Sequence, residues 1–193
     1  MGDGSKSKLS EKKLKELIVY ISTKCAEDTT FAKTKLNKIL FFSDFLYYCK
    51  TGKSISGQSY IHLQYGPVPK EMKFTLEEME NKDIAIAISQ SGPFIQKRVV
   101  ALREPNLDLF EPDMVSHVDG IIQQVCFEKQ IRATWLSRYS HNFMGWLVTK
   151  EGEEIPYQTV FLKNKDQQVI TERENIRSCE LAQHFQNQYG FQN

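Results

Sequence analysis

The chain has 193 residues, of which 40% are hydrophobic and 25% are charged, an ordinary composition for a globular protein of one domain. Its 25 basic and 24 acidic side chains leave a formal net charge of +1. A molecule so nearly neutral has no overall electrostatic attraction to nucleic acid or to an anionic membrane. We therefore expect neither of them as a partner.

The N-terminus and the cysteines indicate a cytoplasmic protein. Residues 1–8 lack the apolar stretch of a signal peptide, and no uncharged apolar run approaches the ~20 residues that span a bilayer. The cysteines are widely spaced and form no C-x-x-C pair, which favours reduced thiols over a disulfide framework or a zinc site. We expect residues 1–8 to be a disordered tail, and we expect no bound metal or cofactor.

The first two predicted elements are helices. Ser10 is a suitable N-cap, and apolar residues then recur at helical spacing as far as Cys25. The second helix, residues 34–49, carries apolar or aromatic side chains on nearly every face and is followed by Gly52, a typical stop. A helix that is apolar all round is normally buried, so we expect other elements to surround it.

An extended segment and a corner follow the second helix. Apolar and polar residues alternate over residues 60–65, which predicts a short strand. Pro67 and Pro69 then fix a rigid corner, because a residue that precedes proline disfavours the helical region. The pattern predicts that helix resumes over residues 70–81.

The second half of the chain begins with the clearest strand signal. Residues 84–88 and 94–102 flank a Ser-Gln-Ser-Gly turn and predict a β-hairpin. Pro112 suits the first position of a helix, Thr134 can cap another, and residues 171–188 predict a polar C-terminal helix. The chain is therefore expected to be mainly α (α+β), a single helical domain around a buried central helix with a small β-hairpin.

No group of residues makes a convincing catalytic site. The glycines of residues 52–59 lack the lysine of a phosphate-binding loop, and Ser140 and His141 are adjacent on a helix and do not face each other. The glutamates at 77–80 and 151–154 are typical of solvated faces. We predict no enzyme; the alternative is a small hydrolase that uses His141 or one of the glutamate clusters.

Several residues are candidates for binding a protein partner. Asp44 interrupts the apolar second helix, so its carboxylate needs either internal hydrogen bonds or a bound partner. Lys33, Lys35 and Lys38 make a basic entry to that helix, which suits an acidic surface or is simply solvated. Tyr65 precedes the corner, and tyrosine serves both as an interface anchor and as a core residue.

Three blocks of residues resemble one known family, the Panacea domain of SocA-like antitoxins. They follow one another as KLNKILFFSDFL at 35–46 with YGPVP at 65–69, LREPNLDLF at 102–110, and SH at 140–141 through GW at 145–146 to IPY at 155–157. The resemblance places the domain at residues 9–163, with a C-terminal linker and polar helix at 164–193. It implies a mostly helical domain from a bacterial or phage toxin–antitoxin system.

The resemblance also implies a function and a partner. Proteins of this family neutralise a toxin encoded by a neighbouring gene through direct binding, without catalysis. An alternative within the family is an adaptor that delivers the toxin to a bacterial protease such as ClpXP. We predict that the partner surface lies near the corner and the polar side of the central helix. Its residues are Lys35, Asp44, Tyr65, Pro67 and Pro69.

Overall fold

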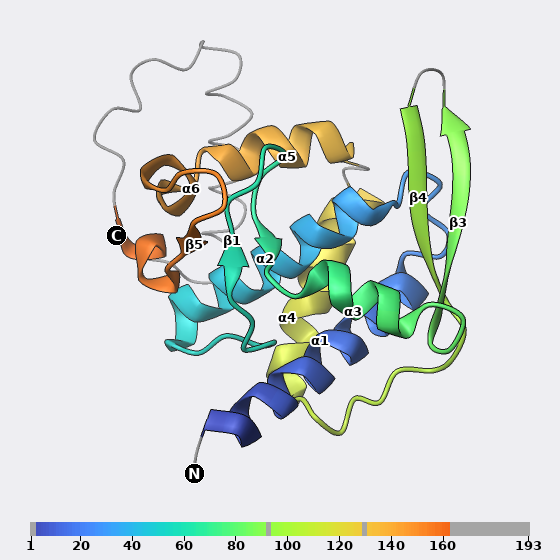
Figure 1. The fold of residues 1–193 in the computed structure, drawn as a ribbon, viewed down its shortest axis with the longest axis horizontal. Helices are drawn as coiled ribbons and strands as arrows, with labels where there is room; N and C mark the ends of the chain where they lie inside the picture. The colour runs from blue at the N-terminus through green and yellow to red at the C-terminus, as the bar shows by residue number, and fades with distance from the viewer. Residues whose placement is uncertain (1–2, 92–93, 129–130, 163–193) are drawn as a thin grey trace.

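The fold is mainly α-helical with two small antiparallel sheets, as predicted (Figure 1). A computed structural model describes residues 3–91, 94–128 and 131–162, so the predicted helix at 171–188 lies outside the described residues. The elements in chain order are α1 (Asp3–Lys24), α2 (Lys33–Thr51), β1 (Tyr60–Ile61), β2 (Val68–Pro69), α3 (Met72–Met79), β3 (Ile84–Ser91), β4 (Phe94–Ala101), α4 (Pro112–Ile122), the π-helix η1 (Gln123–Glu128), α5 (Ala133–His141), α6 (Met144–Val148), β5 (Glu154–Ile155) and the 3₁₀-helix η2 (Tyr157–Phe161).

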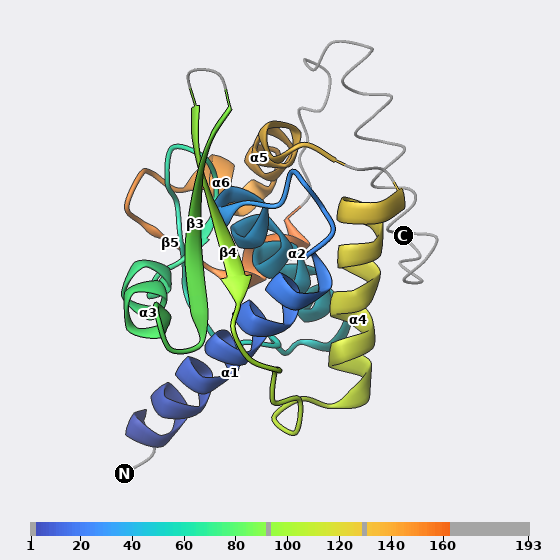
Figure 2. The ribbon, with the colours of Figure 1, turned by 90° about the vertical axis from the view of Figure 1, so that its right-hand side faces the viewer.

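Helix α2 is the centre of the molecule, which confirms the buried helix predicted at residues 34–49. Helices α1, α4 and α5 and strand β4 all contact it, and Figure 2 shows it enclosed between the β-hairpin and α4. Its residues from Lys35 to Phe45 are all buried. Gly52 ends the helix in the left-handed conformation (φ 74°), and its N–H donates to Tyr48 O at 2.8 Å.

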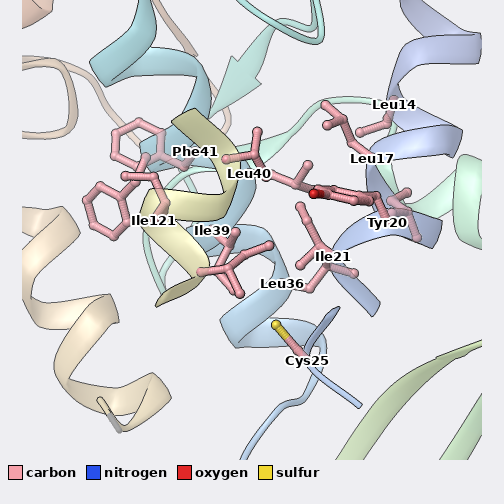
Figure 3. Packing of buried hydrophobic residues seen from close by; sticks show 14 of the residues in the cluster. Leu14, Leu17, Tyr20, Ile21, Cys25, Leu36, Ile39, Leu40, Phe41 and Ile121 are labelled. Carbon is pink, nitrogen blue, oxygen red and sulfur yellow. The ribbon is translucent and has the colours of Figure 1, made fainter. Parts of the chain in front are cut away.

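The hydrophobic core forms where α1 and α2 meet. Figure 3 shows Leu17 and Ile21 of α1 meeting Leu36 and Leu40 of α2, with Ile121 of α4 on the far side of α2. Each such fully buried aliphatic side chain contributes about 1.5–3 kcal/mol of transfer free energy. The packing of these helices therefore supplies much of the favourable free energy of folding.

The two sheets have different roles. In the first, β1 lies between β2 and β5, so that Tyr60 pairs with both Pro69 and Ile155 and joins the corner to the C-terminal part of the domain. The second is the β3–β4 hairpin, with Ile84 opposite Ala101. It confirms the predicted hairpin and stands at the opposite side of the molecule from α6 and β5 (Figure 1).

Three predicted boundaries were wrong. Helix α1 begins at Asp3 and takes in most of the segment expected to be a disordered tail; Ser10 lies inside it and accepts a hydrogen bond from Gln58 Nε2 at 2.6 Å instead of capping it. The strand predicted at 60–65 ends at Ile61, because the chain turns before Gly66. Thr134 lies within α5, whose N-cap is Arg132.

Candidate functional site

The segment between β1 and β2, residues 62–67, forms a tight turn that we call the corner. Gly66 adopts φ +95°, which side chains with a Cβ rarely adopt, and its N–H donates to Leu63 O at 2.8 Å. A Cβ at Gly66 would lie 2.4 Å from Ser140 Oγ and 2.5 Å from Lys38 Nζ. The corner therefore rests directly on side chains of α2 and α5, and glycine is required there by both conformation and space.

Lys38 supports the corner from beneath. Its side chain is only 1% exposed, and Nζ donates to Pro67 O at 3.1 Å. Burial lowers the pKa of the Lys38 amine to about 7, because the charged form loses its hydration. The sequence left two alternatives for this lysine, a solvated face and a surface for an acidic partner. The structure shows neither, because the buried amine binds the backbone of the corner.

A stack of three rings forms the flank of the corner. The Trp146 ring stacks with His62, at a centroid distance of 4.2 Å and an interplanar angle of 23°, and with His141, at 3.9 Å and 11°. Trp146 Nε1 also donates to Leu63 O at 3.4 Å. Burial, together with the nearby Lys38 and His62, lowers the pKa of His141, so its imidazole is neutral at neutral pH. This stack fixes the corner to α5 and α6.

Tyr65 is the residue that the corner presents to solvent. Its side chain is 69% exposed, whereas Pro67 and Pro69 are buried. Pro69 is paired with Tyr60 in the first sheet. The expectation that both prolines lie at an exposed surface was therefore wrong, since they face inward and stiffen the turn that carries Tyr65.

Lys35 is also buried, contrary to the expected position at the surface. Its Nζ lies 2.7 Å from Asp28 Oδ2 and 2.6 Å from Thr30 Oγ1, with none of the lysine side chain exposed. This ion pair holds the loop between α1 and α2 against the start of α2. Lys35 therefore offers no side-chain surface to a partner.

Asp44 is fully buried and accepts several hydrogen bonds. Its Oδ1 accepts hydrogen bonds from the backbone N–H groups of Ile55 and Ser56, both at 2.8 Å. Its Oδ2 accepts hydrogen bonds from the hydroxyls of Tyr60, at 2.7 Å, and Ser56. Burial raises the pKa of Asp44, and these donors oppose that rise. Of the two alternatives in the sequence, the structure shows the internal one: Asp44 fastens the loop after α2 and strand β1 to the central helix.

The residues of the hydrolase alternative have structural partners. Ser140 is fully buried and its Oγ donates to Ser137 O at 2.7 Å, within α5. In the glutamate clusters, Glu78 pairs with Lys15 at 2.7 Å and Glu153 accepts the N–H of Lys150 at 2.8 Å. Within residues 3–91, 94–128 and 131–162, no group of three or more His, Cys, Asp or Glu residues is placed to hold a metal ion.

The convergence of the motif blocks could not be seen in the sequence. Lys38 lies in the first block, and the Ser140-His141 and Gly145-Trp146 pairs lie in the third, about a hundred residues later. Folding brings Lys38 and Ser140 beneath the corner and the rings of His141 and Trp146 to its flank. The helical pattern indicated which element each residue occupies, but not how those elements approach one another.

The fold is that of a small helical domain organised around one buried helix. A family model, antitoxin SocA-like, Panacea domain, matches residues 36–147, more than half of the chain, and the chain belongs to this family. The match contains Lys38, the corner and the ring stack. Comparison with curated proteins and with solved structures gave no match.

Family membership supports a general role as an antitoxin with a toxin as partner, and it points to a function that is not enzymatic. In the part of the chain that the structure describes, no helix is both long and apolar enough to cross a membrane.

Proposed function

We propose that this protein is an antitoxin that neutralises a cognate protein toxin by binding it directly in the cytoplasm, with Tyr65 at the centre of the contact. The observation that carries the proposal is the convergence of family motif residues beneath one corner, from which a tyrosine projects with 69% of its side chain exposed. A structural role alone does not require an aromatic ring at a solvent-facing turn.

The geometry suits a binding anchor. Gly66, Lys38 and the ring stack hold the corner in one conformation, so little backbone freedom is lost when a partner binds. Tyrosine is among the residues that carry most binding energy in protein interfaces. Leu147 and Val148 follow Trp146 in α6 and are about half exposed, so apolar surface continues beside the corner.

Co-expression with the neighbouring gene tests the function. The toxin alone should stop growth, and the wild-type protein should restore it. The amount of toxin in the same cultures separates two mechanisms: toxin persists if binding neutralises it, and it disappears if the protein delivers it to a protease. Toxicity that this protein does not relieve would overturn the proposal.

A substitution tests the corner itself. Tyr65→Ala should weaken toxin binding by about tenfold or more, because truncating an interface anchor costs about 1–2 kcal/mol or more. Ile88→Ala is the matched control, since Ile88 is 70% exposed but lies on the β3–β4 hairpin, at one edge of the molecule and away from the corner (Figure 1). Binding is measured by calorimetry, and thermal unfolding shows whether each variant is folded. If the two variants bind the toxin with equal affinity, Tyr65 is not part of the interface.

A further inference from the structure

The end of α1 and the π-helix η1 bring two cysteines into contact. The Sγ atoms of Cys25 and Cys126 lie 3.3 Å apart, although the residues are 101 positions apart in the chain. Both thiols are reduced and buried. Figure 3 shows Cys25 at the end of the α1 side-chain row. We call Cys25 and Cys126 the thiol pair.

The backbone around Cys25 is held in place by side chains from two other elements, β4 and α2. Arg98 of β4 donates from its guanidinium to the carbonyl oxygens of Asp28 at 2.7 Å and Cys25 at 3.3 Å, and also to that of Ala26. Lys35 of α2 pairs with Asp28 in the same loop. The closeness of the two sulfurs is therefore part of a braced region of the fold.

We propose that the thiol pair is an oxidation site at which a small peroxide forms an intramolecular disulfide between Cys25 and Cys126. One sulfur, as thiolate, attacks a peroxide oxygen and becomes a sulfenic acid, with release of one water after proton transfer. The second sulfur then attacks the sulfenic sulfur, the S–O bond breaks, and a second water leaves. Two thiols and one hydrogen peroxide thus give one disulfide and two waters.

The geometry requires only a small movement. An S–S bond is about 2.05 Å long, so the two sulfurs have to approach by about 1.3 Å from their present separation. Rotation about the two Cα–Cβ bonds moves the sulfurs over such a distance. Cys49, the other cysteine in the described part of the chain, is only partly buried and lies in α2.

The same surroundings make the reaction slow and its product durable. The contact with Cys25 and burial both raise the pKa of Cys126, so little of the reactive thiolate exists at neutral pH. Oxidation therefore proceeds mainly when this region opens. Once the disulfide has formed, the closed structure shields it from reducing thiols.

The disulfide would fasten α1 to η1 and so to the end of α4. It closes a loop of 101 residues, which restricts the unfolded chain and stabilises the fold. This inference is independent of the proposed toxin binding. Its consequence is a longer-lived folded protein after exposure to peroxide.

The experiment uses the reduced full-length chain, treated with hydrogen peroxide and mapped by peptide mass spectrometry. We expect a crosslinked pair of peptides that contain Cys25 and Cys126, a fall from four free thiols to two, and a Tm higher by about 5 °C or more. The double variant Cys49→Ala/Cys179→Ala should keep both the crosslink and the Tm rise. Cys126→Ala should lose both.

The mapping in the double variant remains decisive even if Cys126→Ala is unstable. Three outcomes would overturn the proposal: Cys25 and Cys126 that stay reduced, sulfinic acid in place of a disulfide, and crosslinks that join either residue to Cys49 or Cys179 in the wild type.

Discussion

Lys38 shows how a single residue links the stability of this fold to its candidate site. An amine that is 1% exposed and donates to one backbone carbonyl is held at a cost, because its charged form is poorly solvated. Its folded pKa of about 7 lies below the ordinary lysine value of 10.5. Between these two values the unfolded chain binds more protons than the folded chain, so stability rises with pH across this window and levels off below about pH 7.

Replacing Lys38 by methionine should remove this dependence. We expect Lys38→Met to be more stable than the wild type at pH 7, by about 1–3 kcal/mol, because the buried charge is lost while much of the side-chain volume remains. The advantage should shrink as pH rises toward 9.5. Urea unfolding of both proteins at several pH values measures the difference. A difference that does not change between pH 7 and 9.5 would show that Lys38 titrates normally in the fold.

At the scale of elements, the corner depends on one glycine. Gly66→Ala adds a methyl group 2.4 Å from Ser140 Oγ at a backbone angle of φ +95°, so we expect a loss of about 2–4 kcal/mol and weaker toxin binding. Gly52→Ala is the matched control, because Gly52 also has a positive φ (+74°) but no atom within 4 Å of the added Cβ. That variant should lose about 1 kcal/mol and keep its affinity.

Denaturant unfolding and binding assays of the two glycine variants separate backbone strain from the clash. If both variants lose the same stability and bind equally well, then the contacts of Gly66 with α2 and α5 do not position the corner.

The elements themselves were largely predictable, whereas their limits and contacts were not. The apolar pattern of residues 34–49 and the glycine at position 52 were enough to predict α2 within two residues at either end. Ser10 was a misleading signal. Serine is common at N-caps, but the Ser10 hydroxyl lies inside α1 and accepts a hydrogen bond from Gln58, far away in the sequence. Lysines at helical spacing are normally solvated, so the burial of Lys35 and Lys38 depends on Asp28 and Pro67, which only the folded chain brings near.

At the scale of the whole molecule, the family and the fold class follow from the sequence, but the candidate surface does not. Of the five residues predicted to bind a partner, Tyr65 is the one whose side chain is largely exposed, and its role in binding remains a prediction. Asp44 and Lys35 make internal contacts, with the loop after α2 and with the loop before it, and the two prolines are buried. The corner with Tyr65 is therefore the surface at which we expect a toxin to bind.

Hydrogen exchange on the full-length protein, free and with its purified toxin, shows whether the corner is the binding surface. We predict slower exchange in the complex at the amides of residues 63–66, with little change in the β3–β4 hairpin, which stands apart from the corner at one edge of the molecule (Figure 1). A stable complex in which the hairpin is protected and the corner exchanges as in the free protein would contradict the account.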